Sequence, residues 1–152
     1  MANRDLVHNL KPVVGLAPLG RTATALSSAC DMQGFQSVLV AFHQGAYGDT
    51  PSGSVYTEAE LQESDDNSTY TAVADTDLLF PSGKSARTGT ATGTFFQSKS
   101  TGAADAAGLW LVGYRGSKRY LKVNVRETGT HTTGESYSVT FYLANADYSP
   151  AQ

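Results

Sequence analysis

Two stretches in the last third of the chain alternate between apolar and polar residues, and this alternation constrains the fold more than any other feature. Within residues 119–127 (RYLKVNVRE) and 136–144 (SYSVTFYLA) every second residue in the middle of the stretch is apolar. Because successive side chains of a β-strand point to opposite faces, each stretch predicts a strand with one buried face. The intervening Gly129–Gly134 (GTHTTG) is rich in turn residues, so we expect the two strands to form a hairpin.

Several shorter stretches also predict strands. Ser37–His43 is apolar on both faces and is therefore expected to be a central strand that is covered on both sides, and Leu109–Tyr114 is a further strand. The segment LQESDDNSTYTAV predicts Leu61–Ser64 and Thr69–Val73, joined by the polar turn Asp65–Ser68. Strands separated by short turns indicate an all-β fold: an antiparallel β-sandwich or barrel-like domain of about 7–9 strands, with an extended N-terminal arm.

The chain is expected to hold one β domain with irregular ends. Its 152 residues fit a single domain, which we place at residues 21–148, followed by a tail at 149–152. Residues 1–20 are interrupted by Pro and Gly, so they predict an extended arm, either laid on a neighbouring subunit or folded back along the edge of the parent sheet. Residues 81–108 predict an irregular long loop, with either a short strand at 92–97 or an exposed projection.

Charge and composition exclude some partners. The net charge of −3 and the pI of about 5.5 lack the basic surface of a nucleic-acid binder. No run approaches the ~20 apolar residues of a membrane span, and the N-terminus lacks the apolar segment of a signal peptide, so we expect no membrane partner and synthesis in the cytoplasm. Only 16% of the residues are charged. The surface is therefore polar mainly through hydroxyls, which suits contact with other proteins.

The residues of chemical interest form no catalytic pattern. His8, His43 and His131 are scattered without metal-ligand spacing, and nucleophile-elbow and phosphate-loop motifs are absent. Cys30 stands among small residues and is expected to be a small buried hydrophobe. The Asp65–Asn67 turn is left open as a weak Ca²⁺ site. We therefore predict a protein that is not an enzyme, with no catalytic residue, no cofactor and no metal site.

Some residues of the chain are of types that act on or bind carbohydrate. Three carboxylates, at Glu58, Glu60 and Glu63, are near one another in the sequence, but they are more typical of the solvated side of a strand than of a glycosidase pair. A glycan-binding β-sandwich module remains an alternative, in which Trp110, Tyr114 and Tyr120 stack on sugars. The apolar surroundings of Trp110 favour a place in the core.

Several segments resemble a known group of virion proteins. DMQGFQSVLVAF (31–42), LQESDDNSTY (61–70) and YRGSKRYLKVNV (114–125), preceded by RTATA (21–25), look like segments of small tailed-phage virion proteins with relatives in phage-like gene transfer particles. The resemblance is discontinuous and spans residues 13–145. It implies a β-rich protein that is encoded among head genes and placed on or near the capsid.

The resemblance to virion proteins and the absence of catalytic motifs in the sequence together predict a structural role. We expect a decoration or cement protein on the outer capsid surface of the virion, which binds between subunits of the major capsid protein and stabilises the shell. A homo-oligomer, with a trimer favoured, would grip several capsid subunits at once. A head–tail completion protein or a head fibre is the alternative. The residues expected at the capsid or subunit interface are Leu6, Val13, Val14, Leu16, Arg115, Lys118 and Arg119.

Overall fold

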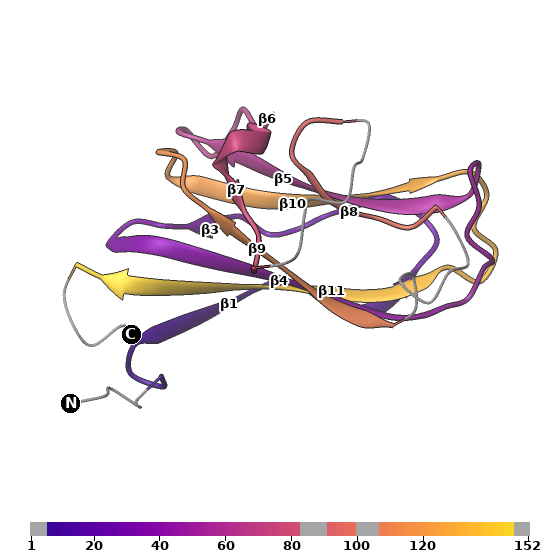
Figure 1. Cartoon of the computed structure of the whole chain (residues 1–152), viewed down its shortest axis with the longest axis horizontal. Coiled ribbons are helices and arrows are strands. Elements are labelled where there is room, and N and C mark those ends of the chain that lie inside the picture. Colours follow the sequence, from indigo (N-terminus) through magenta and orange to yellow (C-terminus); the bar gives the residue numbers. More distant parts are fainter. Residues whose placement is uncertain (1–5, 83–90, 100–106, 148–152) are drawn as a thin grey trace.

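The computed structural model describes residues 6–82, 91–99 and 107–147, and the strands in this part of the chain form two facing antiparallel sheets (Figure 1). Eleven strands and one short 3₁₀ helix are described, and four of the strands are only two residues long. The all-β prediction is confirmed, in its sandwich form. Among the described residues, no helix is long and apolar enough to cross a membrane.

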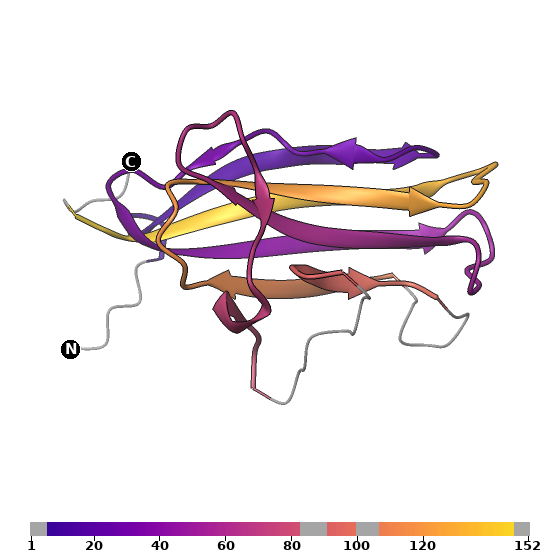
Figure 2. The same ribbon diagram turned by 90° about the horizontal axis from the view of Figure 1, so that it is seen from above.

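Sheet A has the strand order β1-β11-β4-β9-β7, and sheet B has the order β2-β10-β5-β6, with β3 also paired to β10 and β8 to β5. The strands of sheet A are β1 (Leu10–Arg21), β11 (Glu135–Ala146), β4 (Phe35–Tyr47), β9 (Gly108–Tyr114) and β7 (Leu78–Leu79). Those of sheet B are β2 (Ala25–Leu26), β10 (Tyr120–Thr128), β5 (Tyr56–Ser64), β6 (Thr71–Ala72), β3 (Cys30–Asp31) and β8 (Thr94–Gln97), and the 3₁₀ helix η1 spans Asp75–Asp77. Figure 2 shows that the long strands run along the same axis of the molecule.

The core lies between the inner faces of the two sheets. The three apolar residues of the β10 alternation, Leu121, Val123 and Val125, are fully buried, as predicted. Phe42 of β4 stands opposite them, with its ring centroid 4.9 Å from that of Phe96. The core also includes Cys30, which is fully buried as expected. Its burial raises the pKa of the thiol to about 12, which keeps the sulfur protonated and unreactive.

The predicted hairpin of the two alternating stretches is wrong, because β10 and β11 lie in different sheets (Figure 1). Strand β10 pairs with β5, and β11 pairs with β1 and β4. A period of two specifies which face of a strand is buried, but it does not specify the pairing partner. The six-residue connection Gly129–Gly134 instead crosses the ~10 Å between the packed sheets.

The predicted N-terminal arm is, from Leu10 onward, an edge strand of sheet A. Strand β1 pairs with β11 from Leu10↔Ala144 to Arg21↔Glu135, with register irregularities that follow Val14 and Leu16. Proline is tolerated on an edge strand because its missing N–H can face away from the neighbouring strand. The folded-back alternative is therefore the one formed for residues 10–20, whereas residues 1–5 lie outside the described residues, as does the predicted tail at 149–152.

The irregular region predicted at 81–108 contains a buried strand. Strand β8 pairs with β5 and places Phe95 and Phe96 in the core, which agrees with the short-strand alternative at 92–97. Residues 83–90 and 100–106 of the predicted loop lie outside the described residues. The predicted strand–turn–strand at 61–73 is formed, with a shorter second strand. The chain turns at Asp65–Ser68, and β5 pairs with β6, which spans only Thr71–Ala72 of the predicted Thr69–Val73.

The outer face of β5 is less solvated than predicted. Glu58 and Glu60 are buried because Arg126 of the neighbouring β10 lies across both of them. Its guanidinium is 2.6 Å from the Glu60 carboxylate and 3.5 Å from the Glu58 carboxylate. Glu63 lies on the other face, where it accepts a hydrogen bond from the Tyr114 hydroxyl. The three carboxylates therefore do not share one solvated side.

Candidate functional site

The outer face of sheet A carries aliphatic, hydroxyl and other uncharged side chains at the paired positions of its five strands. We call it the uncharged face and define it by residues that lie opposite one another in the strand register. None of them is Asp, Glu, Lys or Arg. They are Leu10, Pro12 and Val14 of β1; Ser138, Thr140, Tyr142 and Ala144 of β11; Ser37, Leu39, Ala41 and His43 of β4; Leu109, Leu111 and Gly113 of β9; and Leu79 of β7.

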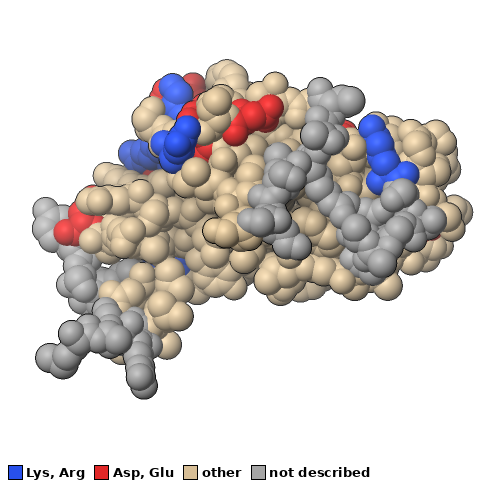
Figure 3. All heavy atoms as spheres, viewed as in Figure 1, with Lys and Arg blue, Asp and Glu red and all other residues tan. Residues whose placement is uncertain are grey.

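Four large aliphatic side chains of the uncharged face are exposed. Val14 is 62% exposed, Leu109 51%, Leu79 46% and Leu39 38%. Strand β4 was predicted to be covered on both sides, but this outward side of it is open. A hollow of about 310 Å³ lies between β1, β11 and β4, lined mainly by apolar side chains. Figure 3 shows one side of the molecule, on which most of the charged side chains lie over the upper layer, which carries β5 and β6.

The predicted apolar interface residues divide into two groups. Val13 and Leu16 of β1 pack against the protein's own core, so they hold the edge strand in place. Val14 is the member of the predicted set that belongs to the uncharged face. Leu6 precedes β1, and its carbonyl oxygen accepts a hydrogen bond from Asn9 N. Its side chain is 65% exposed.

The predicted basic interface residues each face an acidic partner within the chain. Arg119 makes a two-pronged contact with the Asp31 carboxylate, at 2.8 and 2.7 Å, which raises the pKa of Arg119 and lowers that of Asp31. Lys118 is paired with Asp65, which raises the Lys118 pKa. Arg115 lies 3.7 Å from Asp77. All three basic residues lie in the connection between β9 and β10, and each forms a separate ion pair with an acidic residue of the same chain.

The aromatic residues of the glycan-binding alternative do not form a shared platform. Trp110 lies on the inner face of β9, where its ring packs against Phe96 at 4.6 Å between centroids. Tyr114 is buried and hydrogen-bonded to Glu63, and burial raises its pKa. Tyr120 belongs to the other sheet, where Arg119 stacks on its ring.

The Asp65–Asn67 turn uses its oxygen atoms to hold its own backbone. The Asp66 carboxylate accepts hydrogen bonds from the backbone N–H groups of Ser68 and Thr69 and from the Ser64 hydroxyl. These donors lower the pKa of Asp66 to about 2. Asn67 adopts a positive φ of 58°, which Asn tolerates better than most residues. The turn is accounted for as a hairpin connection.

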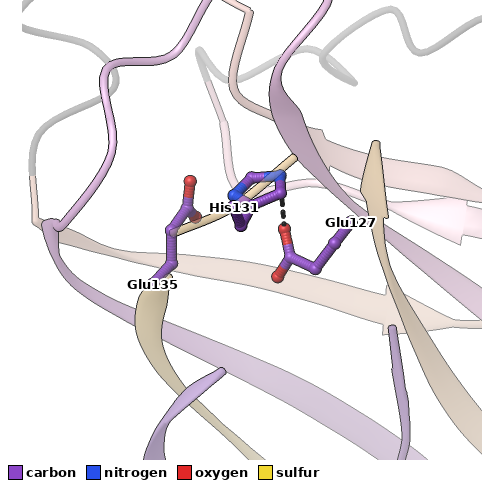
Figure 4. A group of neighbouring side chains, drawn as sticks. All are labelled: Glu127, His131 and Glu135. Atoms are coloured by element: carbon purple, nitrogen blue, oxygen red, sulfur yellow. Dashed lines mark ion pairs between the residues drawn. The ribbon is translucent and has the colours of Figure 1, made fainter. Parts of the chain in front are cut away.

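A buried polar cluster lies where the chain crosses from sheet B to sheet A. Glu127 is near the end of β10, Glu135 begins β11, and His131 lies in the connection between them (Figure 4). The connection is bounded by Gly129 and Gly134, with φ of 84° and 75°. A Cβ at Gly134 would lie 2.2 Å from the Arg21 carbonyl oxygen. Only glycine fits both this conformation and this contact.

The three side chains of the cluster converge within the protein. Their candidate ligand atoms all lie within 4.8 Å of one another, and Figure 4 shows the imidazole between the two carboxylates. The His131 side chain is 1% exposed and that of Glu127 is 2% exposed. His131 Nε2 is 3.0 Å from the Thr128 carbonyl oxygen and 3.4 Å from Glu127 Oε2.

Neighbouring side chains orient the two carboxylates. The Thr57 hydroxyl of β5 donates to Glu127 Oε2, and the Gln44 amide of β4 donates to Glu135 Oε2 at 3.1 Å. Burial raises the pKa of Glu127 and raises that of Glu135 to about 7. The cluster therefore draws groups from both sheets into a site with little access to water.

Sequence reasoning missed this cluster because Gly129–Gly134 was interpreted only as a turn. The available signal was the symmetric spacing Glu127-x₃-His131-x₃-Glu135. That spacing brings three ligand-type side chains together only if the two strands leave in different sheets and the connection turns its histidine inward. The alternation pattern contains neither piece of information.

Comparisons with known proteins find a similar solved structure but identify no family for this chain. No protein-family model matches the sequence, and no curated protein has significant similarity to it. A solved structure of the SPBc2 prophage-derived protein YomS has a TM-score of 0.44 and 16% sequence identity, over 90% of this chain and 94% of that chain.

Proposed function

We propose that this protein is a structural virion protein that decorates a phage capsid and stabilises the shell by binding between subunits of the major capsid protein. The observation that carries the proposal is the uncharged face. A contiguous apolar patch of this kind marks an interaction surface more often than it marks ordinary exposed surface. The sequence segments that resemble tailed-phage head proteins give the class of partner.

The dimensions of the uncharged face suit a protein interface. Five strands spaced by ~4.8 Å, and the seven residues of Ser37–His43 at ~3.4 Å each, give a patch of about 24 by 24 Å. This approaches the ~800 Å² that each partner contributes to a standard interface. Segments around the patch, including exposed Leu6, would supply the remaining area.

The mechanism of stabilisation is thermodynamic. A ligand that binds the assembled shell and not its separate subunits shifts the equilibrium toward the shell by mass action. Because capsid sites repeat by symmetry, a cyclic homo-oligomer such as a trimer would engage several sites together and gain avidity. The proposal requires no bond-making chemistry, and we infer that the protein is not an enzyme.

A particle-sedimentation assay with two matched variants tests the proposal. In Leu39→Lys the charge lies at the centre of the uncharged face, while Leu26→Lys places the same change on a 52% exposed leucine of sheet B. Burying an unpaired charge costs about 2 kcal/mol or more, so Leu39→Lys should bind capsids lacking the protein about 30-fold more weakly or worse. Leu26→Lys should bind like the wild type.

Two results would contradict the proposal. One is equal binding by both variants, and the other is no binding of the wild-type protein to capsids. The copy number in purified particles separates the proposal from its alternative, since decoration requires hundreds of copies whereas a head–tail connector needs about a dozen.

A further inference from the structure

We propose that Glu127, His131 and Glu135 bind one divalent transition-metal ion, of the class of Zn²⁺ or Mn²⁺, which links sheet B to sheet A at the crossing of the chain. The inference rests on the side chains of the crossing and is independent of capsid binding. It assigns a role to a cluster that takes no part in the proposed capsid binding through the uncharged face.

The first support is the ligand set. Two carboxylates and one imidazole converge within 4.8 Å, and nitrogen–oxygen sets of this kind bind first-row divalent ions. Ca²⁺ and Mg²⁺ prefer oxygen ligands alone, so the imidazole favours a transition metal. Three protein ligands are also the number that leaves a coordination position for water.

The second support is a group of buried polar atoms that make no hydrogen bond. Glu127 Oε1 and His131 Nδ1 have no hydrogen-bond partner, and neither does Gln44 Oε1 beside the cluster. Gln44 is 4% exposed and its amide already contacts Glu135. A buried polar atom without a partner is costly. A cation at the centre of the cluster would satisfy the free carboxylate oxygen and the free imidazole nitrogen together.

The third support is the orientation of the three ligand side chains by their neighbours, as is usual at metal sites. With its hydrogen on Nε2, His131 donates to the Thr128 carbonyl oxygen at 3.0 Å, which leaves Nδ1 as the ligand atom. Thr57 and Gln44 hold one oxygen of each carboxylate. Asp49, whose Oδ2 is 3.8 Å from Nδ1, accepts backbone hydrogen bonds from the connection and fixes its path.

The charge balance also favours a cation. Glu127, Glu135 and Asp49 surround one imidazole, and the guanidinium of Arg21 stacks on the Tyr137 ring, 5.0 Å from its centroid. A divalent ion would neutralise two carboxylates in a site that excludes water. Because Glu127 comes from β10 and Glu135 from β11, the ion would tie the two layers together.

The test uses the full-length protein after removal of metal with EDTA and dialysis. Calorimetric titration with ZnCl₂ and with MnCl₂ should show one ion per chain, while CaCl₂ binds at least 10-fold more weakly. At metal concentrations near 100 times the dissociation constant, the melting temperature should rise by about 5–10 °C. Glu135→Gln keeps the shape of the side chain and should weaken binding at least 10-fold, whereas Glu63→Gln and His43→Gln should not.

A second measurement does not depend on the folding of a variant. Substoichiometric Mn²⁺ should broaden the imidazole NMR signals of His131 before those of exposed His43. The inference is overturned if neither metal binds, if Glu135→Gln binds as tightly as the wild type, or if Mn²⁺ broadens His43 or His8 first.

Discussion

Strand β8 should hold the core together at a position where the sequence predicted either a strand or a projection. Phe96 is fully buried, and its ring lies 4.9 Å from Phe42 and 4.6 Å from Trp110 between centroids. Truncating a buried Phe to Ala costs about 3–5 kcal/mol through lost transfer energy and the cavity left behind. Because two aromatic neighbours also lose a partner, we expect Phe96→Ala to destabilise the protein by about 4 kcal/mol.

Urea unfolding followed by Trp110 fluorescence and a calorimetric melt measure this loss. For a domain of this size about 4 kcal/mol lowers the melting temperature by roughly 8–16 °C. Leu79→Ala is the matched control, because this leucine is 46% exposed and its truncation should cost less than about 1 kcal/mol. A loss below about 1 kcal/mol for Phe96→Ala would refute the packing of β8 against the core.

Three further outcomes follow from the edge strand, the buried thiol and the β5–β6 turn. Deleting residues 2–16 should destabilise the domain by about 2–4 kcal/mol in denaturant unfolding, because Val13 and Leu16 are partly buried against the core; unchanged stability would show that β1 is detachable. Native Cys30, with its pKa raised to about 12, should react with a thiol reagent only at the rate of unfolding. The Asp66 pKa is lowered to about 2 from 3.8, so the ionised carboxylate contributes its full stabilisation above pH 3.8 and loses it as the pH falls through about 2. Asp66→Asn should therefore be less stable than the wild type at pH 7. A difference in stability that persists at pH 1.5 would contradict this linkage.

The sequence was sufficient to predict where the main strands lie, but not which strands pair with one another. The buried faces of β10 and of β11 follow directly from their alternation, since the period of a strand is local. The assignment of these strands to opposite sheets is not local, because it depends on which other strands compete for their edges. The same limit explains β1, whose Pro and Gly residues indicated an arm until its pairing with β11 was known.

The two candidate sites also differ in how much of each could be predicted from the sequence. Part of the uncharged face could be read from Ser37–His43, where apolar residues occupy both sides of the strand, although that pattern was interpreted as double coverage. The buried cluster could not be read as a site, because Glu127 and Glu135 converge only through the crossing of the connection between layers. The basic residues of the β9–β10 connection were identified from the sequence, but their ion pairs were not. The sequence shows the charges of Arg115, Lys118 and Arg119, whereas their acidic partners are known only from the structure.

The shared strand β11 allows the two sites to be separated by experiment. Glu135 begins the strand, and Tyr142, which lies opposite Leu39, is seven residues further on, or about 24 Å away. Changes this far apart with no shared partners should add to within about 0.5 kcal/mol. Glu135→Gln should therefore lose metal binding and keep capsid binding, while Leu39→Lys should do the reverse, and the double variant should show both losses unchanged in size. A coupling well above 0.5 kcal/mol would mean that the cluster controls the register of β11, and with it the side chains that β11 presents on the uncharged face.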